Sequence, residues 1–240
     1  MPKIRPLPAA AVLISAAAVF PFSASRLMAD EKDTERLQDA ATVFQEVMDT
    51  PDKGIPRDLL DRAHCIAIVP GLKKGAFIVG AKYGKGFLSC REKTGQWSAP
   101  GAIRVEGGSV GFQIGGSETD VILLVMNERG ANRLLSSQFT LGGEGEVAAG
   151  PVGRSATAQT DAKLTAEILS WSRSRGAFAG ISLQGATLRQ DEDANRGLYG
   201  KKLTNREIVD AAVPPPPAAQ NLIALLNRYS PAEKKSEGTK

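Results

Sequence analysis

Residues 108–116 read Gly-Ser-Val-Gly-Phe-Gln-Ile-Gly-Gly and are the clearest part of a glycine-punctuated run from Pro70 to Asp120. Val110, Phe112 and Ile114 alternate with small or polar residues, so a strand here has one apolar face and one nearly bare face. Glycine weakens a strand, and its repeated use marks bends, bulges or close backbone approach. We therefore predict that another strand or helix packs closely against the bare face.

The rest of the chain divides into helices near both ends and strands in the middle. Strands are predicted at Cys65–Val69, Ala76–Tyr83, Gly86–Arg91, Val121–Met126, Glu146–Ala149, Ala156–Thr160, Ile168–Ser172 and Ala177–Leu188, with turns at Pro70-Gly71 and Gly84–Gly86. Helices are predicted from a cap at Asp33 or Thr34, from Pro56, and over Glu128–Ser137, Asn205–Ala212 and Ala218–Tyr229. This order predicts an α+β fold with a strongly curved, barrel-like antiparallel sheet and helices at both ends of the chain. Val121–Met126 is apolar throughout, which is typical of a central strand.

The first 29 residues have the pattern of a secretory signal peptide. Lys3 and Arg5 precede an apolar stretch from Leu7 to Phe22, and small residues follow. We expect cleavage after Ala29, with Ala24 as the alternative, and an uncleaved membrane anchor is disfavoured because the stretch is short. The predicted location is the periplasm or cell envelope. Cleavage removes three of the 30 basic residues and no acidic residue, which leaves 27 bases against 26 acids.

A near-neutral mature chain is not a nucleic-acid-binding protein by composition. Its basic pairs are dispersed and lack interleaved aromatic residues.

Several glycine-rich blocks occur in an order that resembles the SYLF domain family. These blocks are Gly71–Gly75, Tyr83–Gly86, Trp97-Ser98-Ala99-Pro100, Gly108–Gly115 with Asp120, Ala149–Arg154, Ser172–Gly176, Phe178–Gly185, and Asn195 with Leu198–Gly200. The resemblance covers roughly residues 35–212. It implies a lipid-binding module, which in eukaryotic members is joined to endocytic and actin-associated partners; this chain resembles an exported, bacterial-type member.

The expected organisation has five parts. Residues 1–29 are a signal peptide, 30–212 a SYLF-like domain, 213–217 a polyproline spacer, 218–230 a C-terminal helix and 231–240 a disordered tail. The four prolines could instead dock in an aromatic groove of a partner, but for an exported chain a stiff spacer is the favoured interpretation.

The first helix after the signal is acidic, with seven acids against two bases over residues 30–50. An anionic membrane surface repels such a helix. We therefore expect its apolar positions, which include Leu37, Phe44 and Val47, to dock on the core rather than in a membrane.

Lipid contacts are expected from basic side chains elsewhere on the domain. Lys73 and Lys74 are expected in a turn, Arg173 and Arg175 on one strand face, and Arg154 after a bend. The alternative is that these are ordinary solvated charges.

The residues offer no support for catalysis, a cofactor or a metal ion. His64 is the single histidine and is expected to be structural, and neither a nucleophile elbow nor zinc-type spacing is present. Cys65 and Cys90 are expected on strands that are not neighbours, which favours two buried thiols but leaves a disulfide open.

The predicted function is a non-catalytic lipid- or phospholipid-binding domain in the periplasm or cell envelope. The alternative is a structural or protein-interaction domain without lipid affinity. Membrane lipid is the expected partner, and actin is not expected to meet an exported chain; the oligomeric state stays open.

Overall fold

The computed structural model describes residues 22–50, 54–76, 79–110, 115–144, 146–150, 166–174, 177–178 and 183–232. The helices in these residues are α1 (Phe22–Asp49), α2 (Arg57–Arg62), α3 (Glu128–Leu134), α4 (Glu192–Tyr199), α5 (Asn205–Asp210), the 3₁₀ helix η2 (Pro217–Ala219) and α6 (Gln220–Tyr229). The strands are β1 (Cys65–Ala76), β2 (Val79–Cys90), β3 (Gly101–Val110), β4 (Gly115–Val125), β5 (Gln138–Thr140), β6 (Val147–Ala149), β7 (Ile168–Ser174), β8 (Ala177–Phe178) and β9 (Thr187–Gln190).

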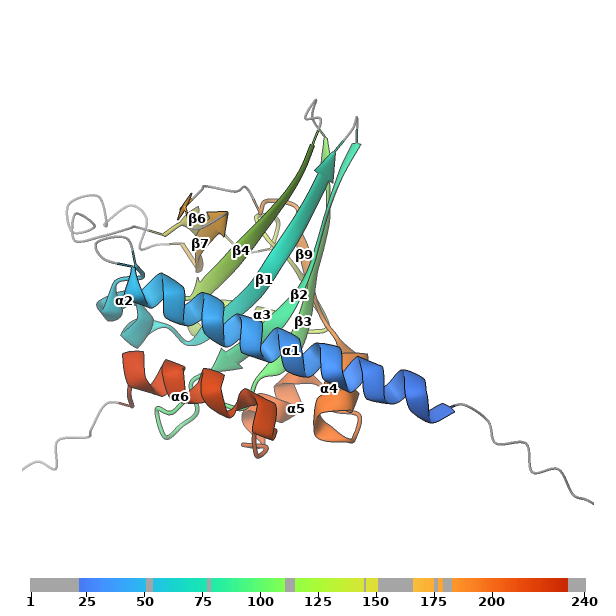
Figure 1. Cartoon of the computed structure of the whole chain (residues 1–240). Helices are drawn as coiled ribbons and strands as arrows, with labels where there is room; N and C mark the ends of the chain where they lie inside the picture. Colours follow the sequence, from blue (N-terminus) through green and yellow to red (C-terminus); the bar gives the residue numbers. More distant parts are fainter. Residues whose placement is uncertain are drawn as a thin grey trace, which may run out of the picture.

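The described strands form one strongly curled sheet in the order β5-β9-β3-β2-β1-β4-β7-β6, and β8 pairs with β7. The predicted α+β class and the helices at both ends are confirmed: α1 lies across one face of the sheet, and α6 packs against α1 (Figure 1). One detail differs, because β6 and β7 pair in parallel rather than antiparallel. The apolar run at Val121–Val125 lies in β4, an interior strand between β1 and β7, as expected.

Both faces of the central strands are buried, each in its own core. Ile66, Ile68 and Ile122 pack with α1, α2 and α6 on one face. Ala67 and Leu123 pack on the other face with α3 and β5. Because successive strand residues point to opposite faces, two cores require apolar residues at nearly every position. This explains why β1 begins with a continuous apolar run and β4 ends with one.

The first two strands are longer than predicted and form a hairpin. The expected turn at Pro70-Gly71 is a β-bulge inside β1, where the register with both neighbouring strands shifts. Gly71 has φ +57°, which glycine adopts without strain. The expected turn at Gly84–Gly86 is likewise continuous strand in β2. The extra residue with positive φ bends the strand at Pro70-Gly71, and it does not reverse the chain there as the predicted turn would.

The hairpin also corrects the prediction for the cysteines. Cys65 and Cys90 are direct partners in the β1–β2 register, with Cα atoms 3.9 Å apart, and they form a disulfide. The expectation of two free thiols was wrong because it placed the cysteines on the first and third strands of a meander.

Helix α1 is docked on the sheet, as its acidic composition predicted. Leu37, Ala40, Ala41, Phe44 and Val47 are buried on the core face. The helix begins at Phe22, so the expected cap at Asp33 or Thr34 lies in its interior. Residues 22–33 contain neither proline nor glycine, and nothing in them stops the helix.

The block Trp97-Ser98-Ala99-Pro100 anchors helices to the end of the sheet. The Trp97 indole donates to the carbonyl of Ser230 at 3.2 Å, just past the end of α6. The Arg91 guanidinium stacks on the Trp97 ring. The Tyr199 hydroxyl of α4 donates to the carbonyl of Pro100 at 2.6 Å. These residues therefore have a structural role, because they hold α4 and the end of α6 against the sheet.

A buried amide pair attaches α4 and α5 to β3. The Asn195 side chain accepts from the Ala102 amide at 2.7 Å and donates to the Asn205 side chain at 2.8 Å. Asn205 donates in turn to the carbonyl of Ala102 at 3.1 Å. Both asparagines are fully buried, so each bond replaces one that water would otherwise make.

Close packing was predicted against the bare face of residues 108–116, but it is not found at the described glycines of that run: a Cβ on Gly108 or Gly116 would meet one backbone oxygen, at 4.0 and 3.9 Å. Close packing is found instead at two glycines elsewhere in the sheet. A Cβ atom on Gly86 would overlap the carbonyl oxygen of Ile68, and one on Gly101 would lie 2.6 Å from Oδ1 of Asn205. At Gly75, by contrast, a Cβ would meet nothing within 4 Å. Other predictions fall outside the described residues, namely the strand Ala156–Thr160, the part of the bare face at 111–114 and most of the tail.

Candidate functional site

A groove of about 880 Å³ lies where β1 and β4 run side by side beyond the cover of α1. We call it the charged groove. Its lining residues are Lys73, Lys74, Gly75, Gly116, Ser117, Glu118, Asp120, Arg173 and Ser174. Lys73 is paired in register with Glu118, and Gly75 with Gly116. The groove therefore carries both signs of charge on a rigid, hydrogen-bonded support.

The bulge in β1 orients one wall of the groove. It leaves the Gly71 amide without a partner in the strand ladder, and this amide donates to Oδ1 of Asp120 at 3.0 Å. The other carboxylate oxygen, Oδ2 of Asp120, lies 3.2 Å from Nη2 of Arg173 on β7. Asp120 thus joins β1, β4 and β7 at this point.

Arg173 is committed to ion pairs and is not a free cation. Its guanidinium also bonds Glu46 of α1, and its side chain is only 13% exposed. Burial alone would lower the pKa of Arg173, but the bonds to Glu46 and Asp120 outweigh it and raise the pKa above its usual value. Arg173 therefore ties the groove to α1.

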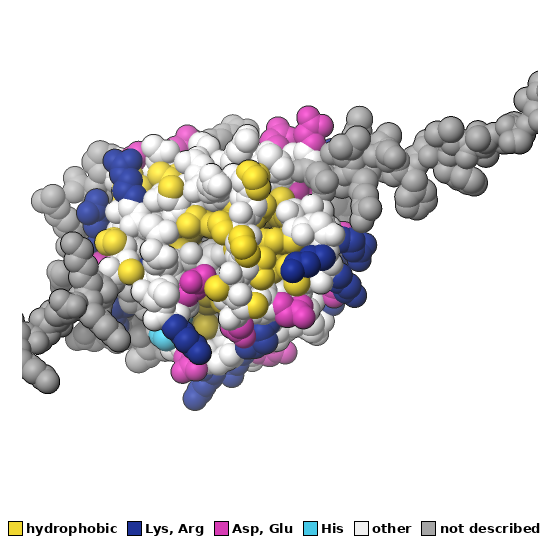
Figure 2. Space-filling view, turned by 90° about the horizontal axis from the view of Figure 1, so that it is seen from below, with side chains coloured by type: hydrophobic (Ala, Val, Ile, Leu, Met, Phe, Trp, Pro, Cys, Tyr) yellow, Lys and Arg dark blue, Asp and Glu magenta, His cyan; other side chains and the backbone are white. Residues whose placement is uncertain are grey.

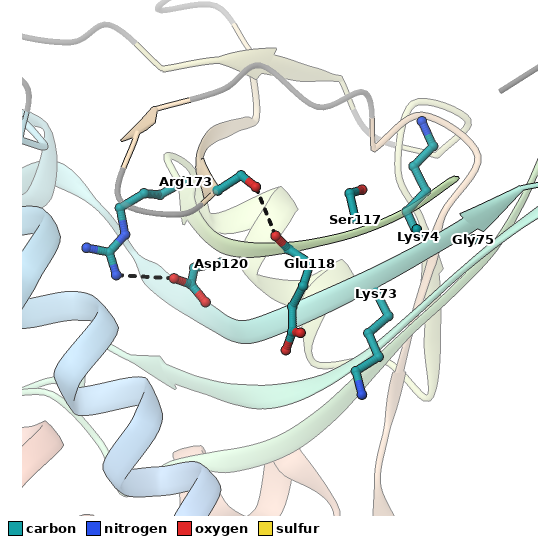
Figure 3. Close-up of a pocket in the computed structure, with 9 residues that line it drawn as sticks. Lys73, Lys74, Gly75, Ser117, Glu118, Asp120 and Arg173 are labelled. Carbon is teal, nitrogen blue, oxygen red and sulfur yellow. Dashed lines mark hydrogen bonds and ion pairs between the residues drawn. The ribbon is translucent and has the colours of Figure 1, made fainter. Parts of the chain in front are cut away.

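Lys73 and Lys74 point to opposite sides of β1 (Figure 3). Lys73 is exposed, whereas Lys74 is half-buried and lies opposite Lys82 of β2. Burial lowers the pKa of Lys82 below its usual value, and the charge on Lys74 lowers it further. The most accessible charges of the groove are therefore Lys73 and Glu118.

Tyr83 lies beside Lys73 on the same sheet face, because the two residues are partners in the β1–β2 register. Its side chain is 48% exposed, and no other large hydrophobic side chain in the described part of the chain is exposed. Tyrosine is enriched at protein-binding surfaces, whose apolar centres are surrounded by a polar rim.

The structure brings together three of the five predicted contact residues. Lys73, Lys74 and Arg173 line the charged groove, whereas Arg154 and Arg175 lie outside the described residues. The expectation of a turn at Lys73 and Lys74 was wrong, since both lie in β1.

The sequence reasoning missed Tyr83 and Glu118 as candidate site residues. Their positions in the site depend on the strand register, which the sequence does not give. One signal for Tyr83 was present in the sequence: the alternation along 79–90 places it on the opposite face of the strand from Lys82.

The described residues contain no cluster of histidine, cysteine or acidic side chains that could hold a metal ion. His64 lies between α2 and β1, where its backbone pairs with Val125 and Arg91. No helix among the residues described here is long and apolar enough to cross a membrane.

Comparison with known proteins identifies the family. The Ysc84 family, described as "Las17-binding protein actin regulator", matches residues 106–229. The chain is 38% identical over 179 residues to LAS seventeen-binding protein 3 of Saccharomyces cerevisiae, which is 73% of this chain and 39% of that protein. It is 34% identical over 181 residues to the SH3 domain-containing YSC84-like protein 1 of Mus musculus, covering 75% of this chain and 53% of that protein. The chain thus spans about two fifths to one half of these relatives.

These relatives overturn the partner prediction, which named membrane lipid and set actin aside. The family is described as an actin regulator, and the yeast relative is named for binding Las17. The SYLF resemblance is confirmed, and the chain belongs to the Ysc84 family.

Proposed function

We propose that this chain is a non-catalytic protein-binding domain that contacts actin filaments through the charged groove. The observation that carries the proposal is the mixed charge of that groove in a member of a family described as actin regulators. The family description concerns binding and regulation rather than a reaction.

The arrangement of charges favours a protein partner. Glu118 is exposed next to Lys73, and Asp120 neutralises Arg173. A protein surface can present charges of both signs in matching positions, which gives specificity and a fast encounter. An anionic lipid surface would attract Lys73 but repel Glu118.

The test is co-sedimentation of the purified chain with actin filaments. Lys73→Glu combined with Lys74→Glu is expected to weaken binding at least about tenfold, because it reverses the exposed charge of Lys73 and the half-buried charge of Lys74 on the other side of the same strand. Lys201→Glu with Lys202→Glu is the matched control, since it changes the same charges on an exposed pair just after α4. Equal weakening by both double variants would contradict the assignment to the groove.

Lipid binding is the finer function that the sequence analysis expected, and it forms a second arm of the experiment. The same variants are sedimented with vesicles of phosphatidylcholine containing phosphatidylserine. If the chain sediments with these vesicles and not with actin filaments, lipid binding replaces actin binding as the proposed function.

Export is a separate proposal from the sequence, and it competes with actin binding in a cell because an exported chain is not expected to meet actin filaments. The first described buried residue of α1 is Asp33, so cleavage before Asp30 leaves the described packing of this helix intact. We expect a mature N-terminus between Ser25 and Asp30 in protein isolated from its native source, measured by mass spectrometry. An intact Met1 would contradict export.

A further inference from the structure

The segment between α5 and α6 reads Ala-Ala-Val-Pro-Pro-Pro-Pro-Ala-Ala over residues 211–219. It lies at the end of the molecule away from the charged groove (Figure 1). On the face seen from below, hydrophobic side chains gather at the centre with charged side chains around them (Figure 2). Pro214, Pro215 and Pro217 are exposed, whereas Val213 and Pro216 are half-buried.

This exposure pattern has a period of three. Pro216 has φ −64° and ψ 153°, which is the polyproline II conformation. Proline fixes its own φ and also restricts the residue before it, so consecutive prolines favour this helix of three residues per turn. Val213 and Pro216 then share the edge that rests on the domain. Pro214 and Pro217 share an edge that faces outward.

Both ends of the segment are anchored to the domain. The Val213 amide bonds the carbonyl of Ile208 at 3.4 Å. Pro217 begins η2, in which the Ala219 amide bonds the carbonyl of Pro216 at 2.9 Å, and Ala219 is fully buried. A segment held in this way has lost much of its conformational entropy before a partner arrives.

We propose that Val213–Pro217 is a ligand for an SH3-type domain, whose aromatic-lined groove receives Pro214 and Pro217. The spacing of these two residues is the PxxP spacing that such grooves recognise on a polyproline II helix. Mouse and fission yeast relatives of this chain are named as SH3 domain-containing proteins, so the two kinds of domain occur together in this family. The surface is separate from the charged groove, and the proposal does not depend on actin binding.

The charge around the segment defines the kind of binding. Residues 207–227 contain no lysine or arginine, and Asp210 is the charged residue nearest to the prolines along the sequence. SH3 binding here therefore rests on proline rings rather than on an ion pair. Its affinity should change less than twofold when salt is raised from about 50 to about 500 mM.

The test is a titration of the full, isotope-labelled chain with the isolated SH3 domain of the mouse relative, followed by nuclear magnetic resonance. Proline has no amide proton, so the reporters are the amides of Ala211–Val213 and Ala218–Gln220. We expect shifts confined to these reporters. Pro214→Ala with Pro217→Ala is expected to weaken binding at least about tenfold.

Two further variants keep the result decisive. Pro214→Ala with Pro215→Ala retains the proline that begins η2 and should also weaken binding about tenfold, with an unchanged melting temperature. Pro231→Ala removes an exposed proline outside the segment and should leave binding unchanged. The proposal is overturned if no reporter amide shifts at about 1 mM SH3 domain. It is also overturned if the variant Pro214→Ala with Pro215→Ala binds as tightly as the wild type.

Discussion

Glycine has opposite roles at the two ends of the sheet, the inner end near the helices and the outer end at the charged groove. Near the helices, Gly86 and Gly101 have no room for a side chain, because Ile68 and Asn205 occupy the space. In the charged groove, a Cβ on Gly75 would meet no atom within 4 Å. Glycine therefore permits close packing at the inner end and leaves the strand surface open at the outer end.

This difference separates stability from binding within single strands. β1 contributes Cys65 and Ile66 to the inner end, where each is fully buried or nearly so. Beyond the bulge at Gly71, the same strand presents exposed Lys73 and Gly75 to the groove. Substitutions at the two ends should consequently affect different measurements.

The largest effect is expected from removing the disulfide at the inner end. Cys65→Ala with Cys90→Ala should lower the free energy of unfolding by about 3.5 kcal/mol, since the bridge closes a loop with a sequence separation of 25 residues. Urea unfolding of the double variant measures this loss. Wild-type protein unfolded in the presence of a reductant is the control and should show a similar loss.

A methyl group at Gly86 should be nearly as costly. Gly86→Ala is expected to reduce the free energy of unfolding by about 3 kcal/mol, because the added carbon overlaps backbone rather than a movable side chain. The same urea experiment applies. A loss below about 0.5 kcal/mol would show that β1 can move away from β2 at the bulge.

An intermediate effect is expected at Gly101. Gly101→Ala places a carbon 2.6 Å from Oδ1 of Asn205, whose hydrogen bonds to Asn195 and Ala102 hold it in place. We expect a loss of about 2 kcal/mol, measured by thermal unfolding. In the background of Asn205→Ala the added loss should shrink, and an undiminished loss would remove the amide pair from the explanation.

The smallest effect, with the opposite sign, is expected at the outer end. Gly75→Ala should stabilise the protein by about 0.5 kcal/mol, because the unfolded chain loses freedom while the folded chain gains no clash. Differential scanning calorimetry against the wild type checks this. A destabilisation comparable to that of Gly86→Ala would end the distinction between the two regions.

The sequence was sufficient for the class of fold and for the docked face of α1. Heptad-like spacing of Leu37, Phe44 and Val47 identifies that face directly, and an apolar run such as Val121–Val125 indicates an interior strand. The strand pairing was not accessible in the same way. Pro70-Gly71 has the composition of a turn, and only the register with β2 and β4 shows that it is a bulge.

That error in register accounts for the missed site residues and the missed disulfide. Because the first strand was predicted to end at Val69, Cys65 and Cys90 were placed on strands that are not neighbours. The same prediction left Lys73 without a partner on a neighbouring strand. Helix α4 was also missed, although Asp191 as its N-cap and Gly200 at its end, with φ 68°, are recognisable signals. The groove depends on which residues face each other across β1, β4 and β7.

Amide hydrogen exchange of the chain with and without saturating actin filaments shows directly whether filaments bind at the outer end of the sheet. We predict added protection at residues 72–76 and 115–120, which form the outer ends of β1 and β4, and no change at residues 65–69 and 121–125 of the same strands. Protection confined to other segments, with none at the charged groove, would contradict the assignment of binding to the outer end of the sheet.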